Sequence, residues 1–436
     1  MSATHRRGFL KQAAAGVAAA GAVANASLAR ANAQDRLVIG LIGCGGRGMH
    51  DAALFRDHHN AVVAYVADPD EGRRQRAAQE FGIDPKNAVG DLRRMLDDPS
   101  VDAVVVATPD HWHAPASILA CDAGKHVYVE KPCSHNVREG RLLVEAARRG
   151  NRVVQHGTQV RSTDMMIDGV KALRAGVIGD VLVAKAWNVQ RRRDIGHGAP
   201  SEAPGGFDYD TWVGPAAMVP YQHNRVHDGW HWWYHFGTGD LGNDGVHDVE
   251  YTRWGLGVET HPSLVSAIGG KYFFDDDQQF PDTHQVVFEY PANGVVGKKR
   301  MLIYESRLWS TSYPRNVDSG AEYYGTKGMM FMSRRGKIQA WDEQNKPIEL
   351  QIEPEGQNDV KHVANFCAAI RGEAQVNAPP EVAHLTTTLC HLGNIAARLG
   401  RSFRFDPDEE RVIGDDEADR LLGRDYRDHW GRPRGA

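Results

Sequence analysis

The chain has 436 residues, and its 51 lysines and arginines against 56 aspartates and glutamates give a formal net charge of −5. Hydrophobic residues make up 42% and charged residues 25%, a composition that indicates a globular protein of two or three domains and excludes general disorder. The acidic balance argues against a nucleic-acid partner. Five cysteines without a CxxC pair exclude a disulfide framework and a zinc ribbon.

Residues 1–33 have the pattern of a twin-arginine signal peptide. The pair Arg6-Arg7 precedes an Ala/Gly/Val-rich stretch at 13–24, and Ala31-Asn32-Ala33 matches a cleavage site. The apolar stretch is too short and too weakly hydrophobic to span a bilayer. We therefore expect export in folded form to the periplasm and no membrane anchor, the alternative being a flexible basic N-terminus.

Alternating strands and helices are predicted over residues 34–157. Apolar Val/Ile/Ala runs predict strands at 36–42, 61–67, 101–107, 126–129 and 152–155. Helices are predicted up to about residue 58 and over 71–81, 114–123 and 137–149. Such alternation is typical of a parallel sheet covered on both faces, so we expect an N-terminal Rossmann domain at 34–157.

The pattern changes after residue 157. A helix at 164–175 and a strand at 181–187 precede a long irregular stretch, residues 191–242, rich in Gly, Pro, His and Trp. Further strands are predicted at 264–268, 285–290, 299–305 and 329–333. These patterns predict a C-terminal α/β domain at 158–358 with an open, mostly antiparallel sheet for substrate binding and possible homo-oligomer contacts. Residues 359–436 are expected to form helices and a tail that pack back on the core.

A dinucleotide-binding motif follows the first strand. The run Gly43-Cys44-Gly45-Gly46-Arg47-Gly48 matches GxGxxG between a strand and a helix. The glycines allow a tight turn and a close approach of pyrophosphate to the helix N-terminus. Asp68 ends the second strand, where a carboxylate accepts from ribose hydroxyls and repels a 2′-phosphate. NAD is therefore favoured over NADP, although Arg73 and Arg74 lie nearby.

Two further motifs follow later strands of the same sheet, where ligands of open α/β sheets bind. They are Thr108-Pro109-Asp110-His111-Trp112-His113 and Glu130-Lys131-Pro132. We predict cofactor contacts from Thr108, Pro109, His111, His113, Glu130 and Lys131. Alternatively, His111 or His113 caps the helix that is expected near residue 114.

Together with GNDGVH at 242–247, these motifs resemble the Gfo/Idh/MocA family of oxidoreductases, over nearly the whole mature chain. The resemblance implies that Lys131 contacts the reacting hydroxyl and the nicotinamide, and that the Lys131–Pro132 peptide is cis. It also implies that His247 is the general base or acid. The family has an Asp four residues before this histidine, and here that position holds Asn243.

Other residues carry alternative interpretations. Gln159, Arg161, His231 and Asn243 are predicted to bind substrate, with Lys131 and His247. The histidines at 223, 227, 231 and 235 recur every four residues, and they either bind a metal, line a carbohydrate cleft with neighbouring tryptophans, or pack under a loop. We predict no metal. The run Arg191-Arg192-Arg193 either binds an anionic sugar or is solvated, and His384 lies either near the cleft or in the core.

The resulting hypothesis is an oxidoreductase that uses tightly held NAD on a secondary hydroxyl of a sugar, inositol or glycoside. One alternative is an enzyme that oxidises a glycoside transiently, eliminates the substituent and reduces the ring again, with net hydrolysis. A second alternative is a non-catalytic protein that binds NAD or sugar.

Overall fold

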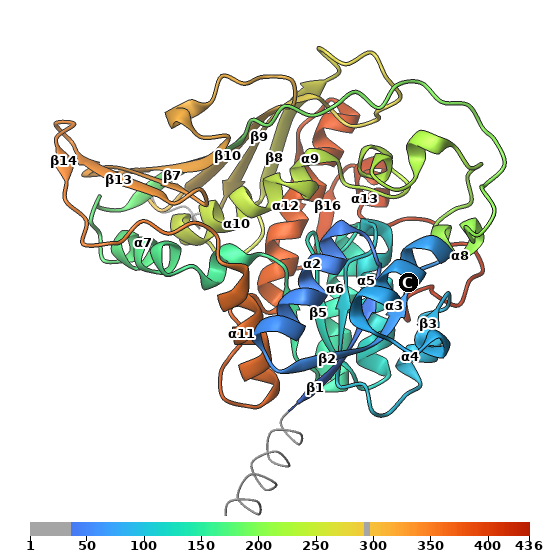
Figure 1. The fold of residues 1–436 in the computed structure, drawn as a ribbon. Coiled ribbons are helices and arrows are strands. Elements are labelled where there is room, and N and C mark those ends of the chain that lie inside the picture. Colours follow the sequence, from blue (N-terminus) through green and yellow to red (C-terminus); the bar gives the residue numbers. More distant parts are fainter. Residues whose placement is uncertain (1–35, 292–296) are drawn as a thin grey trace, which may run out of the picture.

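Two β-sheets organise the residues that the computed structural model describes, 36–291 and 297–436 (Figure 1). The predicted signal peptide at 1–33 lies outside the described residues. Among the described helices, none is long and apolar enough to cross a membrane.

The N-terminal sheet is wholly parallel, with the strand order β3-β2-β1-β4-β5-β6 of a Rossmann fold. Its strands are β1 (Leu37–Ile42), β2 (Ala61–Ala67), β3 (Ala88–Val89), β4 (Ala103–Val106), β5 (His126–Val129) and β6 (Val154–His156). Its helices are α2 (Gly46–His58), α3 (Glu71–Phe81), α4 (Arg93–Leu96), α5 (Asp110–Asp122) and α6 (Val137–Gly150), with the 3₁₀ turn η1 (Pro85–Asn87). The expected strands and helices are thus present, and β3 and α4 are additions.

Helix α5 begins at Asp110, four residues before the predicted start, because extended Pro109 caps it and Asp110 supplies an acid to its first turn. The prediction that His111 or His113 caps a later helix is therefore wrong. Both histidines lie inside the first turn of α5.

The second sheet is mixed and mostly antiparallel, in the order β14-β13-β12-β11-β7-β10-β9-β8-β15-β16, with one parallel pair, β7 and β10. Its strands are β7 (Val181–Asn188), β8 (Leu264–Gly270), β9 (Thr283–Tyr290), β10 (Arg300–Arg307), β11 (Ser319–Gly325), β12 (Gly328–Ser333), β13 (Lys337–Asp342), β14 (Pro347–Ile348), β15 (Phe403–Asp406) and β16 (Arg411–Ile413). The structure thus confirms the expected fold class.

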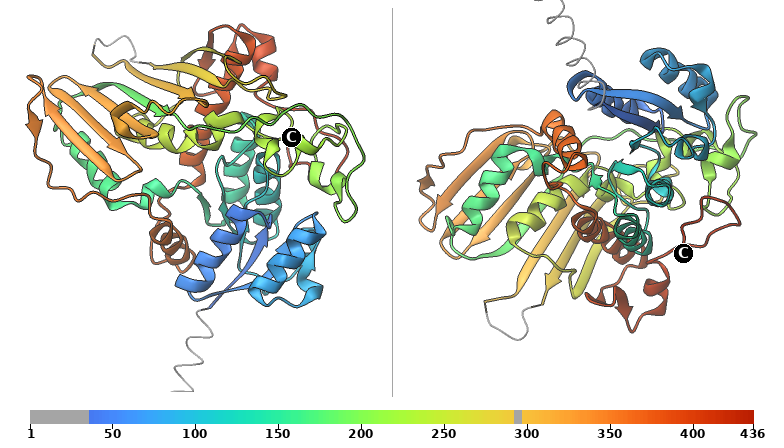
Figure 2. Two further views of the ribbon diagram at one scale, coloured as in Figure 1. Left: turned by 45° about the horizontal axis from the view of Figure 1, so that its top comes forward. Right: turned by 90° about the horizontal axis from the view of Figure 1, so that it is seen from below.

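Helices join the two sheets. On the second sheet pack α7 (Asp164–Arg174), α10 (Gly245–Leu256) and α12 (Pro380–Leu399), and α12 also contacts α6. Helix α11 (Asp359–Ile370) packs on α2. Figure 2 shows both domains flanking this helical layer. The remaining helical segments are η2 (Gln159–Ser162), α8 (Tyr209–Val213), η3 (His223–Arg225), η4 (Gly229–Trp232), α9 (Gly239–Asn243), η5 (Pro314–Asn316) and α13 (Asp416–Arg420).

Two segments outside the Rossmann domain reach across it. The insertion, residues 189–238 between β7 and α9, forms backbone hydrogen bonds with the β2–α3 turn, from Glu71 N to Gly206 O and from Asp208 N to Pro69 O. The tail, residues 421–436, contacts α8 through Arg427 and Asp210 and ends beside α6, where a Cβ on Gly435 would lie 3.1 Å from Leu142. Both segments border the carboxyl edge of the parallel sheet.

Candidate active site

The turn between β1 and α2 requires its glycines. Gly43 has φ +93°, and a Cβ there would lie 2.5 Å from Ala107 O. A Cβ on Gly48 would lie 2.1 Å from Gly43 O. Gly45 caps α2 without a side-chain hydrogen bond, so the first N–H groups of the helix remain available to a pyrophosphate. The turn therefore fits a dinucleotide.

Asp68 joins this turn to the end of β2. Its Oδ2 accepts from Cys44 N and its Oδ1 from Asp70 N, both at 2.8 Å. Burial raises the pKa of the carboxyl group above its usual value. Each oxygen keeps a lone pair for a ribose hydroxyl. Arg73 also lines the cavity, with its guanidinium beside Gly45.

A cavity of about 310 Å³ runs along this edge of the sheet. Of the residues predicted to bind cofactor or substrate, those that line it are Gly43, Gly45, Gly46, Arg47, Asp68, Thr108, Pro109, His113, Glu130, Lys131 and His231. Cys44 and Gly48 belong to the glycine turn but are not among the residues that line the cavity. The Cys44 thiol is buried, and burial raises its pKa.

His111, a predicted cofactor contact, is not among the residues that line the cavity, and its ring faces the insertion. His111 Nε2 lies 2.9 Å from Trp212 O, and Trp112 Nε1 donates to the same oxygen at 3.0 Å. Burial lowers the pKa of His111 to about 3, so the ring is neutral. His113 instead lies between two carbonyl oxygens, with Nδ1 2.6 Å from Pro132 O and Nε2 2.7 Å from Thr108 O.

Lys131 faces the cavity from the end of β5, and the Lys131–Pro132 peptide is cis as predicted. Its Nζ donates to Asn243 Oδ1 at 3.1 Å, which connects the two domains. Asn243 ends α9, and its Nδ2 donates to Asp240 Oδ1 at 3.3 Å. The amide that replaces the expected Asp is therefore a direct partner of the ammonium group.

His247 lies in the first turn of α10, and neither His247 nor Asn243 is among the residues that line the cavity. Its side chain is buried, and its Nδ1 has no hydrogen-bond partner among the described residues. Burial, Arg334 and Lys131 hold the pKa of His247 well below its usual value. Asp244, whose carboxylate Arg192 and Arg334 bind, opposes this shift. The imidazole is thus neutral, with a free ring nitrogen.

Arg47 forms ion pairs with three carboxylates, one of which belongs to Glu130, the residue before Lys131. Its guanidinium pairs with Glu130, Asp51 and Asp359 at 3.0 Å each. Burial alone would raise the pKa of Glu130, but the Arg47 guanidinium and the Lys131 ammonium hold it below its usual value. The sequence did not indicate this network, because α11 contributes Asp359 from a distant segment of the chain.

Two predicted substrate residues lie elsewhere. Arg161 pairs with Glu250 Oε1 at 2.5 Å and stacks on Trp254, so the structure does not place it in the cavity. Gln159 donates to Glu130 Oε1 at 3.1 Å, behind the cavity wall. Both residues follow β6 directly in sequence, but the chain there turns beneath α10 and α11.

The four spaced histidines do not share a helix. Among them, His227 has φ +51°, which separates η3 from η4. His231 lines the cavity and stacks on Trp230 with ring centroids 3.6 Å apart, whereas His223 is exposed. Burial lowers the pKa of His231 to about 3. Aromatic lining of a cleft is the interpretation that the geometry favours.

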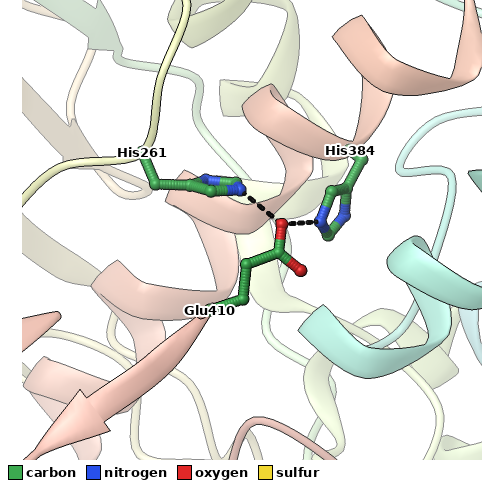
Figure 3. A group of neighbouring side chains, drawn as sticks. All are labelled: His261, His384 and Glu410. Atoms are coloured by element: carbon green, nitrogen blue, oxygen red, sulfur yellow. Dashed lines mark hydrogen bonds and ion pairs between the residues drawn. The ribbon is translucent and has the colours of Figure 1, made fainter. Parts of the chain in front are cut away.

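His261, His384 and Glu410 form a second polar cluster, shown in Figure 3, and none of the three is among the residues that line the cavity. His261 Nε2 and His384 Nε2 lie 2.9 and 2.8 Å from Glu410 Oε1, and the three residues offer ligand atoms within 4.8 Å of one another. Arg141 Nε also donates to Glu410 Oε2 at 3.1 Å. Because a guanidinium already neutralises this carboxylate, the cluster is explained as a hydrogen-bonded ion pair. It places His384 in the core.

Sequence reasoning missed three aromatic cavity residues from the insertion and the tail. Phe207, Trp212 and Trp430 line the cavity, together with Trp230, which is one of the tryptophans that the cleft interpretation of the sequence included. Trp430 lies against Trp112, with ring centroids 5.4 Å apart, and Arg93 covers its ring at 4.2 Å. The aromatic content of the irregular stretch was the available signal for Phe207 and Trp212, and Trp430 had none.

Comparisons with known proteins agree with this architecture. Residues 37–158 match the description "Oxidoreductase family, NAD-binding Rossmann fold", and residues 186–432 match its "C-terminal alpha/beta domain". A scyllo-inositol 2-dehydrogenase (NAD(+)) of Bacillus subtilis (strain 168) is 25% identical over 67% of this chain and 72% of that protein.

Two further similar proteins are named for other activities. A glycosyl hydrolase family 109 protein of Shewanella baltica (strain OS185) is 30% identical over 43% of this chain, and the chain spans 47% of that relative. The crystal structure of aldose-aldose oxidoreductase from Caulobacter crescentus, complexed with glycerol, superposes with a TM-score of 0.65 at 18% identity. That alignment covers 85% of this chain and all of the other, and it shows a shared fold.

Proposed function

The chain belongs to the Gfo/Idh/MocA family of NAD-dependent oxidoreductases, and on that premise we propose that it acts on a secondary hydroxyl of a sugar, an inositol or a glycoside. One observation carries this proposal. The Lys131 ammonium faces the cavity beside the glycine turn and is held by Asn243 of the second domain.

When bound, NAD supplies the hydride acceptor or donor at nicotinamide C4. Gly45 and Gly46 would border its pyrophosphate and Asp68 its ribose. The Lys131 ammonium stabilises negative charge as the substrate hydroxyl loses its proton. The neutral imidazole of His247 would accept that proton. Trp230 and His231 offer ring faces to the apolar C–H face of a polyol.

We also propose that the cofactor stays bound between turnovers. The insertion and the tail border the cavity, and Arg427 of the tail donates to Asp210 Oδ1 and to Gly214 O at 2.6 and 2.5 Å. A retained cofactor suits export to the periplasm, where free NAD is scarce, and a second sugar would then restore its redox state. We propose separately that subunits form a homo-oligomer through the open face of the second sheet.

Purification of the mature protein tests both statements. We expect NAD or NADH to co-purify, and absorbance near 340 nm to change when a sugar, inositol or glycoside is added. A protein that binds NAD but transfers no hydride across a broad polyol panel contradicts the proposed activity.

The glycosyl hydrolase relatives support a second candidate. In it, the same site oxidises a ring hydroxyl of a glycoside to a ketone and eliminates the substituent at the glycosidic bond. Water then adds to the carbon that lost the substituent, and the ketone is reduced again, so that the net reaction is hydrolysis. Release of the aglycone without net NADH would select this reaction over simple oxidation.

A further inference from the structure

The run Arg191-Arg192-Arg193 follows β7, and its three side chains differ in environment. Arg191 and Arg193 are exposed. Arg192 turns inward, and its side chain is 22% exposed. The sequence left open whether this run is solvated or binds an anionic sugar. Only the outer two arginines, Arg191 and Arg193, fit the solvated interpretation.

Arg192 binds two carboxylates that flank Asn243 in sequence. Its Nε and Nη2 donate to Asp240 Oδ1 at 3.0 and 2.7 Å, and Nη2 also pairs with Asp244. The Asp240 side chain is only 2% exposed. An unpaired carboxylate at that depth is costly, so Arg192 is the group that offsets the burial of Asp240 and holds its side chain in place.

Asp240 in turn fixes the orientation of the Asn243 amide. Its Oδ1 accepts from Asn243 Nδ2, which leaves the amide oxygen, Oδ1, to accept from Lys131 Nζ. A flipped amide would set its NH₂ group against the ammonium and lose both hydrogen bonds. The contacts thus run from Arg192 through Asp240 and Asn243 to Lys131.

We infer that Arg192 is a positioning residue for the Lys131 ammonium. The amide at residue 243 has no charge, so the Arg192–Asp240 pair provides the rigid charged anchor that the amide itself lacks. The kinetic consequence rests on the proposed function, whereas the effect on the position of Lys131 does not.

Substitution of single arginines in the run tests this inference. We expect R192A to lower kcat by about 100-fold, the loss typical of a reacting group displaced by about 1 Å, with the Kd for NAD within about twofold. R192K should recover part of the loss. R191A and R193A are matched controls from the same run, and both should behave as wild type.

A second measurement does not depend on activity. Trace acetylation with acetic anhydride, followed by peptide mass spectrometry, reports the freedom of the Lys131 amine. We expect labelling of Lys131 to rise several-fold in R192A and not in R191A or R193A. If R192A does not fold, D240N, which keeps the side-chain shape, should show a smaller rise in labelling.

Equal Lys131 labelling in R192A, D240N and R191A would overturn the inference. If the wild type transfers no hydride but labelling rises in R192A alone, the positioning role stands and the proposed function fails. If hydride transfer is present and kcat of R192A equals that of R191A, the proposed function stands and the positioning role fails.

Discussion

At the scale of single residues, the proposed site combines one ammonium with one neutral imidazole. Lys131 comes from the Rossmann domain, and His247 and Asn243 come from the second domain. The Lys131 partner on that side is an uncharged amide, so the hydrogen bond orients the ammonium without cancelling its charge. This is the arrangement expected of a group that stabilises a developing alkoxide.

Replacing Lys131 tests this role. We expect K131A to lower kcat for hydride transfer by about 100- to 1000-fold, the cost of losing one preorganised electrostatic contact, while NAD still binds. Stopped-flow absorbance of NADH measures the first quantity and calorimetric titration the second. K86A, an exposed lysine of the same domain, is the control, and retained turnover in K131A would contradict the role.

The lowered pKa of His247 predicts how kcat/KM depends on pH. Burial and Arg334 lower the pKa of His247 well below its usual value near 6.5, so the ring stays neutral when the pH falls to that value. Protonation of His247 should therefore not reduce kcat/KM between pH 8 and about 6.5. H247Q should lower kcat by about 100-fold or more. An acid limb above pH 6.5 that disappears in H247Q would refute this assignment.

At the scale of elements, the insertion and the tail complete a cavity that the Rossmann domain leaves open. Trp112 of α5 donates to Trp212 O of the insertion, and a Cβ on Gly214 would lie 2.2 Å from the Trp112 ring. Arg427 then ties the tail to the same segment. Helix α5, the insertion and the tail therefore hold one another in place, and a bound dinucleotide would contact all three.

Removal of the tail contact should loosen the cofactor. We expect R427A to raise the Kd for NADH by about 10-fold, because charge-assisted hydrogen bonds that hold the insertion are lost. NADH fluorescence titration measures this change. R432A, whose guanidinium bonds only to Ala436 O among the described residues, is the matched control. An unchanged Kd in R427A would exclude a role for the tail.

At the scale of the whole molecule, many buried histidines are neutral. Burial lowers the pKa to about 3 or 4 for His111, His113, His156, His284, His362 and His391. In the unfolded chain these groups bind protons below about pH 6.5, so the free energy of unfolding falls as pH falls through that value. Asp110 and Asp248, with pKa values raised by burial to about 7, act in the opposite direction but are fewer.

The urea midpoint should therefore be lower at pH 5.5 than at pH 7.5. Circular dichroism at both pH values, with the ionic strength fixed, measures it. A midpoint that is equal or higher at pH 5.5 would show that the carboxyl groups dominate the balance.

Local patterns in the sequence determined the Rossmann domain. The strand limits at β2 and β5, the glycine turn and the position of Asp68 follow from the period of the backbone and from local steric limits, which act over a few residues. Only the tertiary structure decided which side chains meet. Lys131 and Asn243 lie 112 residues apart, the outer arginines of the 191–193 run are exposed, and Trp430 contacts Trp112 of α5. These contacts depend on how two sheets and their helices pack, and packing selects neighbours that no local period encodes.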